Sequence, residues 1–430
     1  MMQPFPHQLV GARFLAERDA ALLADEPRVG KSGCAVMAAD MVWARRILVV
    51  TTASGRPVWA KAFRDWSAFG RAVQTLYKLT DKPTADVVIV GWGAVAEQKM
   101  FGKLVVQDWD VLVLDESHYA KNPVAKRTAA TFGSADFDHG LCRKAKRTWC
   151  LTGTPVPNAP NDLYPMLRAL CPDRIDGMSY DAFMRRYCVV APRNINGRMI
   201  DVVKGGKNEA ELAERLKGFF LRRTQQDVGI TEPVYETFPL HIDVNLPHEG
   251  DTAAILAAAE SGNTRELEMH LGPLRRLTGV LKAGAVIDAV KEEFANGLDK
   301  IVLMAWHTDV IDVLADGLAE FGPVVIDGRA GAQTRELAEL MFSGDPDCRV
   351  FIGQMQAAGE AIDLSAAAEL IFVEMSSVPK DMKQAALRIT NHGQKRQPRI
   401  RVAALEGSID EALADILTRK VRTIRAVLED

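Results

Sequence analysis

The sequence predicts an α/β protein with two tandem lobes, each built on a parallel sheet, and a helical insert between them. Two observations lead to this prediction. Short apolar runs rich in Val, Ile and Leu recur in both halves of the chain with helical segments between them, an alternation typical of buried parallel strands joined by helical crossovers. The middle of the chain has helical spacing and few such runs.

The strand-like runs fall into two sets, and these sets define the lobes. The first set is 20–25, 46–52, 86–91, 110–116 and 147–153, and the second is 300–307, 323–328, 348–353 and 368–374. We therefore expect lobe 1 over residues 1–160, a helical insert and linker over 161–285, and lobe 2 over 286–430, ending in a helix. The polar, glycine-containing segment 192–208 predicts a loop or a hairpin.

Composition excludes several classes of protein. The 430 residues are 48% hydrophobic and 25% charged, enough for ordinary globular cores. We expect a cytosolic protein with no membrane partner. No run of about eighteen uncharged apolar residues occurs, and the N-terminus lacks the succession of basic, apolar and small residues that a signal peptide has. The six cysteines form no CxxC pair, so neither structural zinc nor a disulfide framework is indicated. A net charge of −3 argues against coating of nucleic acid, although not against a basic cleft.

The first strand-like run is followed by half of a phosphate-binding pattern. In open α/β sheets, ligands lie beyond the carboxyl ends of strands, and here that position holds Gly30, Lys31 and Ser32. Glycine lets backbone N–H groups approach a phosphate, lysine reaches the β and γ phosphates, and the serine hydroxyl can hold Mg²⁺. Asp25 stands where the full pattern has its first glycine, so an ordinary helix start remains the alternative.

Two further strand ends favour a site for ATP and Mg²⁺. The run 110–116 delivers Asp115 and Glu116 side by side; the first can bind Mg²⁺ and the second can orient an attacking water, whereas the alternative is a solvated strand end. The run 147–153 leads to Thr152 and Thr154, whose hydroxyls could sense the nucleotide or could belong to a plain turn. The order of the three segments along the chain favours the nucleotide site.

Taken together, the segments DEPRVGKS, DESH, LTGTPVPN and GFFLRRTQQDV resemble the Swi/Snf-type ATPases of helicase superfamily two, and the resemblance covers nearly the whole chain. The compact form, the aligned second lobe and the DESH box followed by Lys121-Asn122 are most similar to the HARP-like annealing-helicase branch and its phage-borne relatives. The resemblance implies two RecA-like lobes and a DNA-dependent ATPase that uses ATP and Mg²⁺.

The resemblance also implies roles for residues of lobe 1. Gln8 matches the glutamine that reads the adenine edge, and His118 matches the residue that links the DESH box to the motif around Thr154. Ser54 matches a small hydroxyl that touches the phosphates of the tracked strand, while Trp59 is expected to pack in the core. The other matched positions are Gly30, Lys31 and Ser32 for phosphate and magnesium, Asp115 and Glu116 for magnesium and catalysis, and Thr152 for coupling.

In lobe 2 the resemblance implies that Gly359 approaches the nucleotide, although Ala361 replaces a second glycine. The last motif, roughly QxxxRxxRxGQ in the family, begins at Gln384, a coupling residue, and its first arginine is Arg388, the residue expected to face ATP. Its second arginine is Asn391 here. Because an arginine finger supplies a factor of about 10³ to 10⁵ in phosphoryl transfer, this change could leave a slow motor. Arg28 in the phosphate loop is another departure.

Nucleic-acid contacts are also expected in lobe 2. His307 ends the first strand-like run of that lobe, and Arg396 belongs to a basic cluster near the end of the chain. Such clusters usually form a solvated surface, and the functional interpretation is that they contact the phosphates of nucleic acid. The clusters are Arg143, Lys144, Lys146 and Arg147; Arg222 and Arg223; and Lys395, Arg396, Arg399 and Arg401.

We therefore expect a monomeric, ATP-dependent translocase that moves on double-stranded DNA without reading its sequence, in replication, recombination, repair or protein displacement. It would work in the cytoplasm of a prokaryotic or phage-infected cell, or in the nucleus of a eukaryotic one. One alternative is a helicase that separates or anneals strands. Another, from a different class, is a degenerate relative that binds DNA without turnover.

Overall fold

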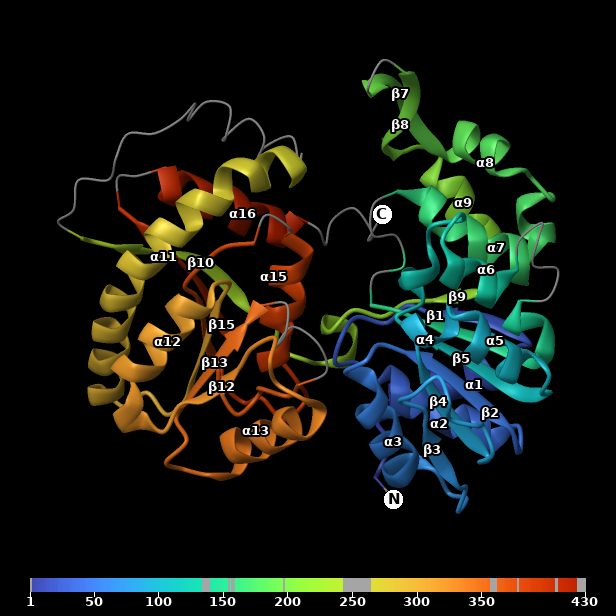
Figure 1. Ribbon diagram of the computed structural model, residues 1–430, viewed down its shortest axis with the longest axis horizontal. Coiled ribbons are helices and arrows are strands. Elements are labelled where there is room, and N and C mark those ends of the chain that lie inside the picture. Colours follow the sequence, from blue (N-terminus) through green and yellow to red (C-terminus); the bar gives the residue numbers. More distant parts are fainter. Residues whose placement is uncertain are drawn as a thin grey trace. The chain divides into compact units, whose positions relative to one another are not determined.

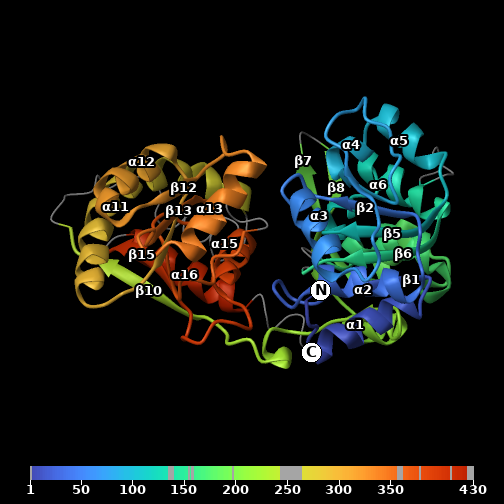
Figure 2. The same ribbon diagram turned by 90° about the horizontal axis from the view of Figure 1, so that it is seen from below.

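The computed structural model describes residues 2–133, 140–153, 155, 159–195, 198–242, 264–355, 362–376, 379–406 and 409–423. The chain divides into two compact units, Met1–Thr224 and Gln225–Asp430 (Figures 1 and 2). Each unit has its own parallel sheet with helices on both faces. The α/β class with two parallel-sheet lobes is therefore confirmed. No helix among the described residues is long and apolar enough to cross a lipid bilayer.

Unit 1 contains a seven-stranded parallel sheet in the order β3-β4-β2-β5-β6-β1-β9. Every residue of β2 and β4 is buried, which explains why these strands appear in the sequence as continuous apolar runs. All five strand-like runs of the first half form strands. The strands are β1 (Ala20–Leu23), β2 (Ile47–Thr51), β3 (Val73–Thr75), β4 (Val87–Gly91), β5 (Trp109–Asp115), β6 (Ala145–Leu151) and β9 (Phe220–Leu221).

Helices cover both faces of this sheet, and Figure 2 shows α1 and α2 on one side of the strands and α5 and α6 on the other. The first face carries α1 (Pro6–Ala16), α2 (Lys31–Met41) and α3 (Gly55–Trp66). The second carries α4 (Trp92–Val95), α5 (Gln98–Val105), α6 (Lys126–Phe132), α7 (Tyr164–Leu170), α8 (Tyr180–Tyr187) and α9 (Glu209–Leu216). Short 3-10 helices span Ser117–Ala120, Leu141–Lys144, Pro160–Leu163 and Pro172–Ile175.

The helices expected in a separate insert after residue 160 belong to unit 1. Leu167, Phe183 and Leu216 are buried in the same apolar cluster as the strand residue Leu22. The observed division at 224/225 therefore differs from the expected boundary at 160, because the apolar faces of these helices are buried against lobe 1. The segment predicted to be a loop or hairpin lies within the antiparallel pair β7 (Cys188–Ile195) and β8 (Arg198–Gly206), which Figure 1 shows projecting beyond α8.

Unit 2 contains a six-stranded parallel sheet in the order β10-β15-β14-β11-β13-β12. All four strand-like runs of the second half form strands of this sheet. No strand-like run predicted β10 or β15. The strands are β10 (Val234–Leu240), β11 (Ile301–Ala305), β12 (Val324–Ile326), β13 (Val350–Gln354), β14 (Glu369–Phe372) and β15 (Arg399–Leu405).

The helices of unit 2 also cover both faces of its sheet. One face carries α11 (Thr264–Ala295) and α12 (Thr308–Gly317), and the other carries α13 (Ala332–Gly344), α15 (Pro379–Ala386) and α16 (Ile409–Thr423). Three short 3-10 helices span Gln226–Val228, Ala319–Phe321 and Leu387–Ile389. Because α11 is continuous across residue 285, the expected boundary there falls inside a helix of unit 2.

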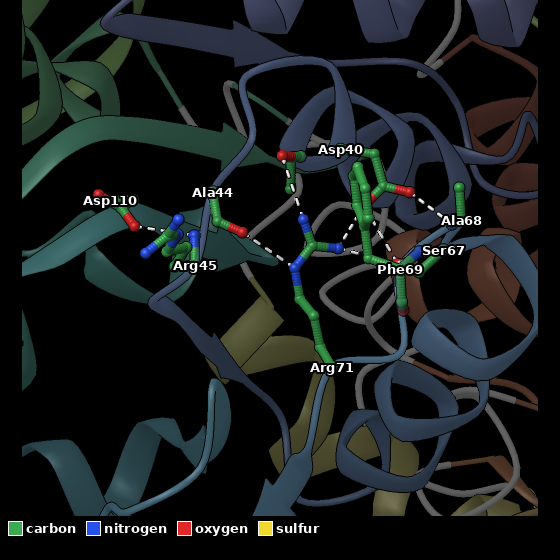
Figure 3. A network of polar contacts seen from close by, with 9 residues as sticks. Asp40, Ala44, Arg45, Ser67, Ala68, Phe69, Arg71 and Asp110 are labelled. Atoms are coloured by element: carbon green, nitrogen blue, oxygen red, sulfur yellow. Dashed lines mark hydrogen bonds and ion pairs between the residues drawn. The ribbon is translucent and has the colours of Figure 1, made fainter.

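Asp40 and Arg71 join the carboxyl ends of α2 and α3 (Figure 3). The Arg71 guanidinium pairs with the Asp40 carboxylate, and it donates to the carbonyl oxygen of Ala44 at 2.9 Å and to Ser67 Oγ at 2.8 Å. The other Asp40 oxygen accepts the Ala68 N–H at 2.6 Å. Both charged side chains are largely buried, so this cluster fixes the two helices relative to each other at the ends opposite Lys31 and Ser54.

A buried ion pair joins α11 to α16 in unit 2. Lys282 Nζ lies 3.0 Å from Asp410 Oδ2 and donates to the carbonyl oxygen of Ala403 at 3.1 Å, and both charged side chains are almost fully buried. The same carboxylate oxygen accepts the Leu405 N–H at 3.0 Å. Such a pair is costly to break, because either ion alone would remain buried without a counter-charge.

We expect Lys282→Met to destabilise unit 2 by about 3–5 kcal/mol, because it leaves the Asp410 carboxylate buried and unpaired. Urea unfolding monitored by circular dichroism would measure the loss. Lys291→Met is the matched control, since Lys291 pairs with Glu320 on the surface of the same region and such exposed pairs contribute about 0–1 kcal/mol. Equal unfolding free energies for the two variants would contradict the expectation.

Candidate active site

The loop between β1 and α2 has the backbone of a phosphate-binding turn. Gly30 precedes α2 in a left-handed conformation, with φ of 98°. A Cβ at this position would lie 2.2 Å from Gln8 Nε2, so only glycine fits. Lys31 Nζ donates to the carbonyl oxygens of Asp25 at 2.7 Å and Glu26 at 3.1 Å. The lysine thus lies over its own loop, where the oxygens of a bound phosphate would compete for it.

Gln8, which the resemblance matches to a residue that reads the adenine edge, lies beside this loop. It belongs to the first turn of α1, is 4% exposed, and its Oε1 accepts the Phe5 N–H at 2.9 Å. The neighbouring His7 Nε2 lies 2.9 Å from the carbonyl oxygen of Val29, and burial is the main cause of its lowered pKa. Helix α1 therefore packs two polar side chains against the candidate phosphate loop.

Asp25, which replaces the first glycine of the full pattern, has a structural partner. Its carboxylate is fully buried and pairs with Arg223, whose Nε donates to Asp25 Oδ1 at 3.1 Å. Arg222 Nη2 lies 3.8 Å from Glu26 Oε1. The pair Arg222 and Arg223, in sequence a candidate solvated face or phosphate contact, instead neutralises two acidic residues of the loop.

The end of β5 places Asp115 next to the loop lysine. Asp115 Oδ2 accepts hydrogen bonds from Thr51 Oγ1 at 2.7 Å and from Trp59 Nε1 at 2.8 Å. Burial raises the pKa of the Asp115 carboxyl to about 6, and the charge of Glu116 adds to this rise. Trp59 is 1% exposed, so it packs in the core, as expected, and it also orients a candidate catalytic carboxylate.

Glu116, His118 and Thr152 form a hydrogen-bonded group on two neighbouring strand ends. His118 Nδ1 lies 2.9 Å from Thr152 Oγ1 and 3.2 Å from Glu116 Oε2, and Thr152 Oγ1 lies 3.4 Å from the same carboxylate oxygen. Glu116 has φ of 47°, a left-handed conformation that is uncommon outside glycine. Such strain often marks functional sites. The structure thus brings together three of the residues proposed for catalysis and coupling.

Ser32 and Asp115 are the residues that would hold a divalent cation. Both described hydrogen bonds of the Asp115 carboxylate go to Oδ2, and its burial leaves a need for positive charge that Lys31 meets only in part. Ser32 lies in the first turn of α2. The described residues contain no cluster of three or more His, Cys, Asp or Glu side chains suited to a metal, so Mg²⁺ would rely on one or two protein ligands plus phosphate and water.

Ser54 is the residue that precedes α3, and its Oγ lies 3.1 Å from Thr52 Oγ1. The backbone N–H of Gly55 donates to the same Thr52 hydroxyl at 3.1 Å. Helix α3 therefore begins at the candidate DNA contact and carries Trp59 about one turn later.

In unit 2, His307 lies just after β11 and is held by a buried carboxylate. Its Nδ1 lies 2.6 Å from Glu374 Oε1, and Glu374 Oε2 accepts the backbone N–H groups of Trp306 at 2.7 Å and His307 at 2.9 Å. The His307 side chain is 24% exposed, whereas that of Glu374 is fully buried. Nothing in the local sequence indicates Glu374 as the partner of His307.

The last motif lies on α15 and the 3-10 helix that follows it. Gln384 is on α15, and Arg388 is in the 3-10 helix Leu387–Ile389; both are partly buried. The Asn391 side chain bonds Ser365 Oγ and accepts the Gly393 N–H at 2.6 Å. The residue that stands in place of the second arginine therefore closes a turn within its own unit.

The three arginines of the basic cluster at residues 395–401 form ion pairs within unit 2. Arg401 is 4% exposed and donates to Glu293 Oε2 at 2.8 Å, and Arg399 Nε lies 3.0 Å from Glu369. The side chains of Arg396 and Arg399 are similarly exposed, at 47% and 45%, and Arg396 donates to the carbonyl oxygen of Ala366 at 2.9 Å. Of these three arginines, Arg396 and Arg399 keep the exposure that a DNA contact needs, whereas Arg401 does not. The proposed residues Thr154 and Gly359, and the departure Ala361, lie outside the described residues.

Unit 1 thus carries the groups of a phosphate-loop nucleotide hydrolase. A family profile described as "SNF2-related domain" matches residues 7–245, more than half of the chain. The chain belongs to the SNF2-related family, which confirms the resemblance to Swi/Snf-type ATPases.

Curated relatives match almost the whole chain. The mouse (Mus musculus) protein "DNA annealing helicase and endonuclease ZRANB3" is 27% identical, over 98% of this chain and 40% of the relative. The Caenorhabditis elegans "SWI/SNF-related matrix-associated actin-dependent regulator of chromatin subfamily A-like protein 1 homolog" is 28% identical, over 98% of this chain and 61% of the relative. The chain thus spans about 40 to 60% of the length of these two relatives.

Among solved structures, the chain is similar to "Sulfolobus solfataricus SWI2/SNF2 ATPase core in complex with dsDNA", with 19% sequence identity and a TM-score of 0.46. The alignment covers 99% of this chain and 93% of that one.

The raised pKa of Asp115 predicts a pH-dependent stability. At pH values between the pKa of this carboxyl in the unfolded state, near 3.8, and its pKa in the folded state, about 6, the folded state binds more protons than the unfolded state. This group therefore lowers the stability of the fold as the pH rises through that range. In the absence of nucleotide, we expect the unfolding free energy of Asp115→Asn to rise relative to that of the parent chain by about 3 kcal/mol as the pH increases from 4 to 7. Urea unfolding at several pH values would measure this difference. A difference independent of pH would contradict it.

Trp59→Phe tests the orientation of Asp115. The change keeps an aromatic ring in the core but removes the N–H donor, and loss of such an outer partner typically weakens metal binding about 10-fold or more. Calorimetric titration with Mg²⁺·ADP would measure the affinity. Trp149→Phe is the matched control, because buried Trp149 donates to the carbonyl oxygen of Arg18 rather than to the site. Equal weakening in both variants would show that Trp59 acts only through packing.

Proposed function

We propose that this chain is an ATP-dependent translocase on double-stranded DNA that couples ATP hydrolysis to movement. The observation that carries this proposal is the gathering of Lys31, Asp115 and the group Glu116–His118–Thr152 at the carboxyl edge of one parallel sheet. Family membership supports the ATPase assignment. The relatives' printed names, which mention DNA annealing helicases, support DNA as the partner.

In the proposed mechanism, Lys31 exchanges the carbonyl oxygens of its own loop for the β and γ phosphates. Ser32 and Asp115 would hold Mg²⁺, which would neutralise charge on those phosphates when bound. Glu116 orients the attacking water, and the hydrogen bonds of Glu116 with His118 and Thr152 fix its position. Gln8 contacts the base, and Arg388 and Gly359 supply contacts from lobe 2, so that binding closes the lobes and hydrolysis opens them.

The DNA would be held through its backbone. Ser54 at the start of α3, His307 after β11 and Arg396 are the proposed phosphate contacts, and Gln384 and Thr154 would pass the nucleotide state to them. Backbone contacts fix position without reading bases, so movement would be independent of sequence. We infer a monomer that works in the cytoplasm of a prokaryotic or phage-infected cell, or in the nucleus of a eukaryotic one.

Two alternatives remain as outcomes of a test. A helicase that separates or anneals strands would share every ATPase residue and differ only in what it does to the duplex. A DNA-binding module without turnover is favoured by Asn391, which makes contacts within its own turn where the family has a second arginine, and by the positive φ of Arg28 in the loop.

A coupled ATPase assay with and without duplex DNA tests the proposal. We expect duplex DNA to stimulate hydrolysis, and Lys31→Ala and Glu116→Gln to lower the stimulated rate by at least about 100-fold, as for loss of a group that acts on the transition state. Lys99→Ala, an exposed lysine of α5, is the control and should leave the rate unchanged.

Unchanged hydrolysis in Lys31→Ala would mean that the nucleotide binds elsewhere, and DNA binding without hydrolysis would favour the module. Triplex displacement without fork unwinding would favour the translocase over the helicase.

A further inference from the structure

The chain passes from unit 1 to unit 2 between Thr224 and Gln225, and the residues on both sides of this boundary are firmly fixed, each within its own unit. Arg223 is largely buried, and Gln225 is 1% exposed. A connection between two lobes is more often exposed and variable. The partners of these two side chains are therefore informative.

On the unit 1 side, the segment before the boundary runs parallel to β1 and continues past it along the phosphate loop. The Ala24 N–H donates to the carbonyl oxygen of Leu221 at 2.7 Å, and the Glu26 N–H donates to that of Arg223 at 2.9 Å. The Arg223 side chain pairs with the buried Asp25 carboxylate. Three consecutive loop residues are thus attached to the last residues of unit 1.

These attached residues are also the ones that hold Lys31. Its ammonium group donates to the carbonyl oxygens of Asp25 and Glu26. If Lys31 leaves these carbonyls for a bound phosphate, the hydrogen bonding of both residues changes. Arg223 is bonded to Asp25 through its side chain and to Glu26 through its carbonyl oxygen, so it experiences that change directly.

On the unit 2 side, Gln225 is attached to the segment that carries Arg388. Gln225 Nε2 donates to Thr390 Oγ1 at 2.9 Å, and this hydroxyl donates to the carbonyl oxygen of Leu387 at 2.8 Å. Thr390 is fully buried. The carbonyl oxygen of Gln225 also accepts the Ile230 N–H at 2.9 Å, so both ends of this residue are held.

We propose that Arg223 and Gln225 are positioning residues that connect the phosphate loop to the Arg388 segment through a short hinge at Thr224. The proposal rests on the proposed function, since it assigns a purpose to lobe closure. With Arg223 bonded to the loop and Gln225 bonded beside Arg388, the backbone torsions around Thr224 are left to absorb the rotation, as in hinges that act over a few residues. A longer connection would let one lobe move without the other.

The variant Gln225→Met tests this connection. Methionine keeps the length and the burial of the side chain but cannot donate to Thr390. Gln226→Met, at the exposed neighbouring position, is the matched control. Energy transfer between dyes on Lys99→Cys in unit 1 and Glu336→Cys in unit 2, both exposed positions, reports lobe movement without requiring turnover. Cys171, which is less buried than the other cysteines, would be changed to serine.

We expect Mg²⁺·ADP with beryllium fluoride to change the energy transfer in the parent chain and in Gln226→Met, but to produce little change in Gln225→Met. Stimulation of ATP hydrolysis by duplex DNA should fall about tenfold in Gln225→Met, a usual size for coupling between sites, while calorimetric affinity for Mg²⁺·ADP stays unchanged. Arg223→Lys should behave in the same direction, because lysine keeps the charge but loses the two-pronged contact with Asp25.

A full energy-transfer response in Gln225→Met would overturn the proposal, and so would a matching loss of Mg²⁺·ADP affinity, which would indicate general damage to the site. Failure of the proposed function gives a different result. In that case the parent chain does not hydrolyse ATP. Comparison of its energy-transfer response with that of Gln225→Met still reports whether Gln225 couples nucleotide binding to lobe movement.

Discussion

The candidate site of unit 1 depends on how acidic side chains are neutralised at the carboxyl edge of its sheet. Asp25 is fully buried and Glu26 nearly so, and Asp115 lies next to Glu116 with its pKa raised to about 6. A buried carboxylate without a counter-charge costs several kcal/mol. Arg223 meets this requirement for Asp25. At Asp115 the requirement is only partly met, and Asp115 is one of the two residues proposed to hold Mg²⁺.

The sequence predicted most of the strands in both lobes, because parallel strands covered on both faces must be apolar along their whole length. It did not predict β15, where arginines alternate with apolar residues. Arg401 can lie in the interior because Glu293 and Glu369 pair with it, and such partners, more than a hundred residues away in the case of Glu293, leave no local signal. The expected boundary at residue 160 differs from the observed division for a similar reason, because helical spacing does not show which lobe buries the apolar face of a helix.

The positions of the candidate site residues were predictable where a strand end fixes them, as for Lys31, Asp115 and Glu116. Their supporting partners were not. Trp59 carries an indole N–H that reaches Asp115, yet its sequence context shows only an amphipathic helix. Glu374 follows an apolar strand, as Glu116 does, but it is buried and binds backbone N–H groups and an imidazole. Identical local patterns thus serve a candidate catalytic role in one lobe and a supporting role in the other.

The position of β1 in its sheet has a consequence during synthesis. This strand, residues Ala20–Leu23, pairs on one side with β6 near residue 150 and on the other with β9 at Phe220–Leu221. At about 5–20 residues per second, many seconds separate the emergence of β1 from that of its second neighbour. Throughout that interval a fully apolar strand has an unpaired edge, the kind of edge that can pair with another chain.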